Sequence, residues 1–252
     1  MKMHVLAGGR LRVRKGIYIP NVDRSETIEL PISAFLIRHP QGNVLFDSGY
    51  HPSVAENAGV RWGGMAKSMT PIGLPDENVV DSLRCIGFNP EDIDVVVCSH
   101  LHPDHCGCTG FFTKATMVCH AKEVAAARAP DSAKMGYFRD DWDQIPIQEI
   151  DGQHDLFGDE RIVLVPVPGH TPGTIAALVN LDRSGQFLLA SDAVSLRFSL
   201  DENVMPRNTW NVDQAWASFA EIKRIENGGA TVICGHDDVQ WQSLKKGLDT
   251  YE

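Results

Sequence analysis

The stretch Ser99–His105, SHLHPDH, places three histidines and one aspartate within seven residues. His100 and His102 are separated by one residue, so their imidazoles point the same way from an extended or turning backbone and can bind one ion. A proline then fixes a turn. Asp104 and His105 follow that turn in a new direction and can serve a second ion a few ångströms away. This segment alone therefore predicts half of each of two metal sites.

The remaining ligands are expected at the ends of apolar strands elsewhere in the chain. His170 lies in the Pro/Gly-rich loop VPVPGHTPGT, Asp192 follows FLLAS, and His236 follows TVIC. Side chains just past the end of a buried strand project onto the rim of a sheet. We predict two ions bridged by Asp192 and a solvent hydroxide, one ion held by His100, His102 and His170, the other by Asp104, His105 and His236.

A single histidine or aspartate at a strand end is more often a solvated or capping residue than a ligand. Five of the ten histidines, however, fall in this one pattern. That so many histidines share one pattern favours a metal site over a set of unrelated solvated or capping residues. The other five are interpreted as structural or exposed: His4, His39, His51, His120 and His154.

Two pairs of similar segments indicate a chain built from two like halves. FLIRHPQGNVLFDSG (35–49) and ALVNLDRSGQFLLASDA (177–193) each predict a strand, a turn and a strand, followed by an aspartate. DVVVCSH (94–100) and ATVICGH (230–236) are short β-branched runs that end in cysteine, a small residue and histidine. Chance resemblance of two valine-rich strands is the alternative for this second pair.

Helical patterns alternate with these strands. Residues 76–88 carry apolar side chains at helical spacing with Asp76 as the expected N-cap, and AKEVAAARA and residues 212–229 follow the same logic. The sequence contains no evident linker, low-complexity segment or short tandem repeat. We therefore predict one domain spanning residues 1–252, an α/β sandwich of sheets covered by helices.

Composition excludes several classes of protein. The formal net charge is −10, and clustered basic residues for a nucleic-acid backbone are missing. No apolar run has the length of a membrane span, and no secretory signal is recognised, so a cytoplasmic location is expected. The six cysteines are scattered and expected to be reduced. Cys106 and Cys108 are interpreted as small packing residues beneath the site, not as a C-x-C metal motif.

The motifs SHLHPDH, PGHTPG, SDA and CGH, in that order and spacing, resemble those of the metallo-β-lactamase superfamily, most closely its N-acyl homoserine lactonase branch. The resemblance implies an αβ/βα four-layer sandwich, in which two β-sheets are flanked by helices. It also implies two Zn²⁺ ions, with iron or another divalent metal as the alternative. LFDSG resembles the first motif of the family, whose aspartate, here Asp47, supports the site from behind the ligands.

The implied activity is hydrolysis of a lactone ring, in particular that of an N-acyl homoserine lactone, by a hydroxide that bridges two zinc ions. Asp192 would bridge the metals, and Asp104 would carry the proton to the leaving group. The alternative is another dinuclear ester, thioester or phosphoester hydrolase of the same fold. The expected partner is a small lactone or ester, with no nucleic acid and no membrane, and a homodimer is left open.

The sequence departs from the lactonase pattern at one position. In the lactonases that the chain resembles, a tyrosine three residues after the bridging aspartate hydrogen-bonds the substrate carbonyl. This chain has Ser195 there, whose hydroxyl is too short to reach the carbonyl unaided. Either a water bridges the gap, another donor substitutes, or the substrate is different. Residues 60–75 mix Trp62 and Met65 with glycines and are interpreted as an apolar lid over an acyl chain. Core packing or a dimer contact is the alternative. Ser195, Trp62, Met65 and Arg197 are the predicted substrate-binding residues.

Overall fold

The computed structural model describes residues 1–74 and 76–252. In this part of the chain the first sheet has eight strands, ordered β13-β1-β2-β3-β5-β6-β7 with β4 paired to β1. These strands are β1 (Lys2–Arg14), β2 (Thr27–His39), β3 (Gly42–Phe46), β4 (Met69–Pro71), β5 (Val95–Val97), β6 (Thr116–His120), β7 (Ile147–Ile150) and β13 (Thr250–Tyr251).

The second sheet has five strands among the described residues, ordered β12-β11-β10-β9-β8. They are β8 (His154–Asp155), β9 (Ile162–Pro166), β10 (Ile175–Leu181), β11 (Gly185–Ser191) and β12 (Thr231–Cys234). The α-helices are α1 (Ser53–Trp62), α2 (Val79–Cys85), α3 (Ala121–Arg128), α4 (Arg139–Trp142), α5 (Arg197–Asp201), α6 (Val212–Asn227) and α7 (Asp238–Ser243). Short 3₁₀ helices are η1 (Lys15–Ile17), η2 (Gly63–Lys67), η3 (Pro90–Asp92), η4 (Thr109–Phe111), η5 (Ser132–Met135) and η6 (Asp192–Val194).

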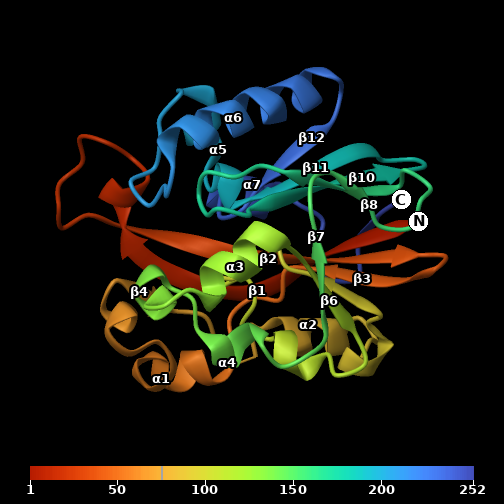
Figure 1. The fold of residues 1–252 in the computed structure, drawn as a ribbon, viewed down its shortest axis with the longest axis horizontal. Coiled ribbons are helices and arrows are strands. Elements are labelled where there is room, and N and C mark those ends of the chain that lie inside the picture. The colour runs from red at the N-terminus through yellow and green to blue at the C-terminus, as the bar shows by residue number, and fades with distance from the viewer. Residues whose placement is uncertain (75) are drawn as a thin grey trace.

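The two sheets face each other, and helices cover their outer sides. Between the sheets, Phe35 and Phe46 of the first pack in one buried cluster with Leu164 and Val179 of the second. In Figure 1, α6 lies on one outer side and α1, α2 and α4 lie on the other. The predicted four-layer αβ/βα sandwich is therefore confirmed.

Helix α6 shows how the pattern produces the layer. Asn211 caps it by accepting the N–H of Gln214 at 3.0 Å. Ala215, Phe219 and Ile222 fall at i, i+4 and i+7, and all three are buried on the second sheet side. Each large apolar side chain buried in this way contributes about 1.5–3 kcal/mol.

The helix predicted over residues 76–88 begins later than expected. Helix α2 spans Val79–Cys85, and its N-cap is Asn78, whose side chain accepts the N–H of Asp81. Asn78 has extended φ and ψ of −134° and 165°, which is the usual backbone of an N-cap. The prediction of Asp76 as the cap is therefore wrong.

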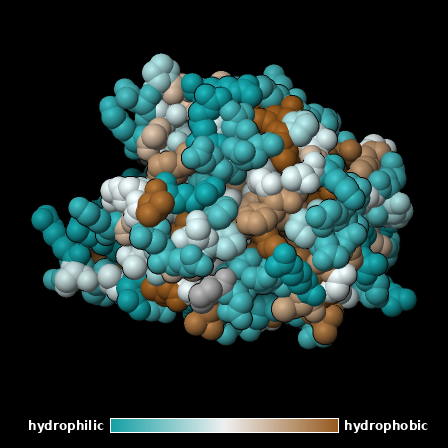
Figure 2. All heavy atoms as spheres, turned by 90° about the horizontal axis from the view of Figure 1, so that it is seen from below, coloured by the Kyte–Doolittle hydropathy of each residue, from teal (hydrophilic) through white to brown (hydrophobic). Residues whose placement is uncertain are grey.

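The two ends of the chain lie side by side (Figure 1). Strand β13 pairs with β1, and Lys2 Nζ lies 2.6 Å from Glu252 Oε1. Seen from the side of α1, α2 and α4, hydrophilic residues dominate the surface and apolar ones are interspersed (Figure 2). None of the helices in the described ranges combines the length and apolar character that a membrane crossing requires.

Both pairs of similar segments occupy corresponding places in the two sheets. The first hairpin is β2–β3 and ends at Asp47, and the second is β10–β11 and ends at Asp192. Strand β5 leads to His100 in the first sheet, as β12 leads to His236 in the second. The β3–β5 and β11–β12 pairs are both parallel, so their carboxyl ends deliver these side chains to the same rim.

Candidate metal centre

Three imidazoles converge at the rim from two loops. His102 Nδ1 lies 3.1 Å from His100 Nε2 and 3.0 Å from His170 Nε2. His102 Nε2 lies 3.1 Å from the carbonyl oxygen of Met135, so the N–H is assigned there and Nδ1 turns a lone pair to the cluster. Three ring nitrogens pointing at one volume is the arrangement expected of ligands to one cation.

The second group consists of Asp104, His105 and His236. Asp104 Oδ2 lies 3.7 Å from Nε2 of each histidine. His105 Nδ1 donates to Asp47 Oδ2 at 2.9 Å, and His236 Nδ1 donates to Pro31 O at 2.9 Å. Because Nδ1 of each ring donates outside the cluster, the Nε2 atom that is left for a metal ion in the neutral form faces inward.

Asp192 stands between the two groups and gives one oxygen to each. Oδ1 lies 2.8 Å from His236 Nε2 and 3.5 Å from His105 Nε2. Oδ2 lies 3.4 Å from His170 Nε2. A carboxylate placed in this way has the geometry to bridge two ions.

The residues present fit a divalent metal pair. Among the described side chains, His105 Nε2 and Asp192 Oδ1 are buried and make no hydrogen bond. Buried polar atoms are normally satisfied, and these two face acceptor lone pairs, which a cation would satisfy. A donor set of imidazole nitrogen and carboxylate oxygen suits zinc and iron alike.

Burial keeps two of the imidazoles neutral. It lowers the pKa of His170 to about 4. It also holds the pKa of His100 well below its ordinary value, and the neighbouring rings of His105, His102 and His170 lower it further. Neutral imidazole is the form that binds metal.

His105 behaves differently because carboxylates surround it. Burial opposes a charge on this ring, but Asp104, Asp47 and Asp192 outweigh burial and raise its pKa to about 10. In the same way, burial works against ionisation of Asp192, but His236, His170 and His105 hold its pKa well below the ordinary range. The cluster thus attracts positive charge at its centre, which a divalent cation supplies in place of a proton.

Asp47 connects the ligands to the backbone from behind. Besides His105, its carboxylate accepts the N–H of Ser99 at 2.7 Å and the hydroxyl of Ser99 at 2.8 Å. Ser191 Oγ lies 2.7 Å from Ser99 Oγ. Asp47 and Ser191 have φ of +59° and +46°, a region that non-glycine residues occupy only where the surroundings hold them. The structure therefore brings Asp47 behind His105, as the resemblance implied.

Glu123 joins the two histidine loops, a role that its place in the sequence does not indicate. This fully buried carboxylate accepts the N–H of Leu101 through Oε1 and the N–H of Gly173 through Oε2, both at 3.0 Å. The hydroxyl of Tyr137 also bonds to it. Glu123 lies in the first turn of α3 within AKEVAAARA, and nothing in that run distinguishes it from a solvated helix residue.

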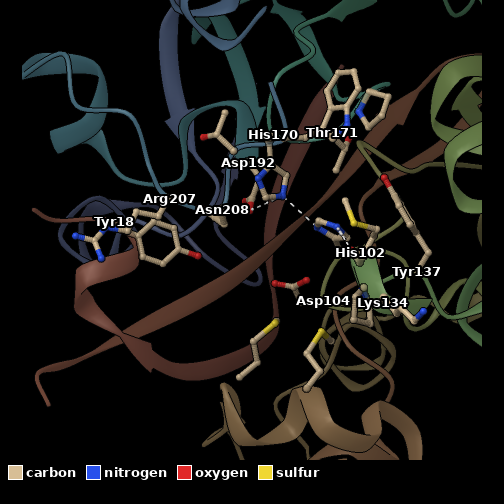
Figure 3. A pocket seen from close by; sticks show the side chains of 18 residues that line it. Tyr18, His102, Asp104, Lys134, Tyr137, His170, Thr171, Asp192, Arg207 and Asn208 are labelled. Carbon is tan, nitrogen blue, oxygen red and sulfur yellow. Dashed lines mark hydrogen bonds and ion pairs between the residues drawn. The ribbon is translucent and has the colours of Figure 1, made fainter. Parts of the chain in front are cut away.

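A cavity of about 410 Å³ opens over the cluster. His102, Asp104, His170 and Asp192 form part of its wall. The rest of the wall comes from loops far apart in the chain and includes Tyr18, Met65, Met69, Lys134, Tyr137, Arg207, Asn208 and Trp210. Figure 3 shows Tyr18 and Tyr137 on opposite sides of this cavity.

Only some of the predicted substrate-binding residues line the cavity. Met65 lines the cavity, but Trp62, Ser195 and Arg197 are not among the described residues that do so. Trp62 is 2% exposed and packs edge-on against Tyr50. For this residue, the alternative interpretation, packing in the core, therefore holds. Residues 60–74 contain the end of α1, η2 and β4, while Pro75 of the predicted lid lies outside the described residues.

Ser195 and Arg197 are not among the described residues that line the cavity. Ser195 is 1% exposed, and its carbonyl accepts the N–H of His236 at 2.8 Å. The guanidinium of Arg197 is held by Glu226 and by Asp201. Their placement in the substrate pocket is therefore corrected, whereas Asn208 and Trp210 of the same loop do line the cavity.

The two cysteines after the ligand run pack as expected. Both are buried, and the Cys108 thiol donates to the carbonyl of Tyr50 at 3.1 Å. Burial raises the pKa of Cys106 and of Cys108, so both remain neutral thiols. Neither belongs to a candidate metal group among the described residues.

Comparison with known proteins identifies the family. Residues 27–236 match the model of the metallo-beta-lactamase superfamily, and the chain belongs to that superfamily. It is 32% identical to the N-acyl homoserine lactonase AttM of Azorhizobium caulinodans, over 100% of this chain and 99% of the relative. It is 31% identical to the N-acyl homoserine lactonase AiiB of Agrobacterium fabrum, over 99% and 98% of the two chains.

Solved structures agree on the fold. An N-acyl homoserine lactone hydrolase with the product N-hexanoyl-L-homoserine at its catalytic metal centre superposes with a TM-score of 0.90. It shares 22% identity, and the match covers 99% of this chain and 98% of that one. AidC, a dizinc quorum-quenching lactonase, gives a TM-score of 0.69 at 15% identity, over 94% and 87% of the two chains.

Proposed function

We propose that this protein is a dizinc lactonase that opens the ring of N-acyl homoserine lactones. The observation that carries the proposal is the shared position of Asp192, with one oxygen toward His170 and the other toward His105 and His236. This cluster forms the floor of a cavity large enough for a small ester. The lactonase relatives, similar along their whole length, support the same substrate class.

Two zinc ions, when bound, would supply a water that ionises near neutral pH and a Lewis acid for the ester carbonyl. The residues of the chain hold the ions, orient the ester and manage the proton. Asp104 lines the cavity with its carboxylate beside His105 and His236, and in this position it would carry a proton to the leaving oxygen of the ring. Met65 and Met69 offer flexible apolar surface to an acyl chain.

One observation favours a second candidate, an anionic ester such as a phosphoester. Lys134 and Arg207 both line the cavity and would attract a negative group. Lys134 is already paired with Asp131 at 3.1 Å, which reduces its contribution. A phosphodiester therefore belongs in any substrate panel.

The proposal is tested by measuring hydrolysis of hexanoyl- and decanoyl-homoserine lactone, γ-butyrolactone, a simple thioester and a phosphodiester, with metal content determined on the same sample. We expect fast opening of the acyl lactones, slow turnover of the phosphodiester and about two zinc ions per chain. His102→Ala should lose activity, whereas His154→Ala, a matched histidine deletion in β8, should retain it. The proposal would be overturned if the phosphodiester were the preferred substrate, or if the protein hydrolysed none of these esters.

A further inference from the structure

The cavity contains a hydroxyl that the sequence motifs do not indicate. Tyr18 follows η1, in the connection between β1 and β2, and it lines the cavity together with Asp104 and Asp192. In Figure 3 its hydroxyl points into the cavity toward Asp104. The Tyr18 side chain is therefore aimed at the space where an ester carbonyl would lie against the metal cluster.

Other hydroxyls near the cavity are hydrogen-bonded within the protein or belong to residues outside its described wall. The Tyr137 hydroxyl, on the opposite wall, bonds to Glu123 and Thr171. The Thr209 hydroxyl donates to Pro206 O at 2.7 Å. Ser195 is buried and is not among the described residues that line the cavity. Tyr18 is thus the phenol best placed to reach a bound substrate.

The position of the Tyr18 ring is fixed on two sides. The ring is 7% exposed and packs in the buried cluster that includes Leu30, Ile32 and Leu196. The N–H of Arg207 donates to Ile17 O at 2.8 Å, which joins the Tyr18 connection to the loop that carries Asn208. Such support places the hydroxyl before substrate arrives.

The hydrogen bond with Asn208 determines what the phenol can do. Burial raises the pKa of Tyr18 well above its ordinary value, and Asp192 and Asp104 raise it further, whereas the Asn208 side chain acts in the opposite direction. An amide N–H that donates to the phenol oxygen acts in this direction. A phenol that accepts such a bond keeps its own proton for another acceptor.

We propose that the Tyr18 hydroxyl donates a hydrogen bond to the lactone carbonyl oxygen and strengthens that bond as the oxygen becomes negative. This inference rests on the proposed function. In the reaction, a water oxygen bonds to the carbonyl carbon, the ring C–O bond breaks, and the proton released from water ends on the leaving oxygen. Tyr18 keeps its proton throughout and acts by stabilising charge.

The test compares three hydroxyl deletions in the zinc-loaded full chain with hexanoyl-homoserine lactone as substrate. Tyr18→Phe should lower kcat/KM by about 10- to 100-fold, mostly through kcat, because the bond is strongest in the transition state. Tyr251→Phe, a matched deletion in β13, should leave kcat and KM unchanged. Ser195→Ala tests whether the Ser195 hydroxyl, and not the Tyr18 phenol, contacts the lactone carbonyl.

Two readouts separate a catalytic role from a structural one. Zinc content and melting temperature of Tyr18→Phe should match those of the wild type, since the ring and its packing remain. Calorimetric binding of the ring-opened product, N-hexanoyl-homoserine, should weaken several-fold, because its carboxylate accepts the same hydrogen bond. Asn208→Ala should give a smaller loss of kcat than Tyr18→Phe, since the phenol remains but is less well oriented.

Unchanged kinetics in Tyr18→Phe, or a larger loss in Ser195→Ala, overturns the role of Tyr18. A loss of kcat accompanied by a loss of zinc overturns it as well, because the effect would then be structural. Failure of the proposed function is a separate outcome, since the wild-type protein would then not open the lactone at all.

Discussion

Replacing Glu123 by glutamine should weaken the connection between the two histidine loops. The carboxylate accepts the N–H groups of Leu101 and Gly173, both at 3.0 Å, and is fully buried. Glutamine keeps one acceptor oxygen but turns an NH₂ toward the other backbone N–H, and it removes the negative charge from both bonds. A buried hydrogen bond to a charged group contributes about 1.5–3 kcal/mol. We therefore expect the free energy of unfolding to fall by about 2–4 kcal/mol.

For a chain of this size, that loss lowers the melting temperature by about 5–15 °C. The assay is urea unfolding and thermal melting of Glu123→Gln, together with zinc affinity. That affinity should fall because Leu101 follows His100 directly and Gly173 lies in the same loop as His170. Glu221→Gln is the matched control, since Glu221 pairs with Arg224 at 2.7 Å on the surface. The control should stay within about 0.5 kcal/mol of the wild type. A Glu123→Gln protein equally close to the wild type would show that the carboxylate does not hold the two histidine loops together.

Three further predictions follow from the site and its supports. Asp192→Asn or His105→Ala should lose one metal equivalent and most turnover while remaining folded by circular dichroism; unchanged metal content and activity contradict a dinuclear centre. Gly173→Ala should cost about 1–3 kcal/mol in urea unfolding, because its Cβ would clash with the backbone nitrogen of Glu123. In contrast, the Cβ of Gly64→Ala meets nothing within 4 Å, so this variant should be near neutral. Burial raises the folded-state pKa of Asp141 to about 6, despite Arg61. The stability that the protonated Asp141 carboxyl contributes is therefore full below about pH 4 and is lost as the pH rises through 6. Asparagine does not ionise, so the free energy of unfolding of Asp141→Asn should rise by about 2–3 kcal/mol relative to that of the wild type between pH 4 and pH 7. An equal pH dependence of urea unfolding in the two proteins contradicts that assignment.

The metal cluster could be predicted because its residues follow strand ends. His100 and His236 come directly after buried β-branched runs, and Asp192 leaves a hairpin, so the sheet rim collects them whatever the loops do. The structure brings all seven predicted ligands together in three overlapping groups. The two hairpins and helix α6 were predicted for the same reason, since periodicity and caps are local properties of the chain.

The cavity wall could not be predicted, because it depends on contacts between distant segments. Trp62 and Arg197 have the right chemistry for a pocket, but Trp62 finds Tyr50 in the core and Arg197 finds Glu226 on α6. Tyr18 and Glu123 reach the site through tertiary placement alone. No spacing within KGIYIP or AKEVAAARA distinguishes these two residues from ordinary loop and helix residues.

The most direct test of the dizinc lactonase proposal is a pH-stat titration. Metal-free protein receives zinc in steps from zero to three equivalents, and the rate of acid release from hexanoyl-homoserine lactone is recorded at each step. A dinuclear centre predicts that the rate rises to a plateau at about two equivalents, because both ligand groups, which share Asp192, must be filled. A plateau at one equivalent, or no acid release at two, would contradict it.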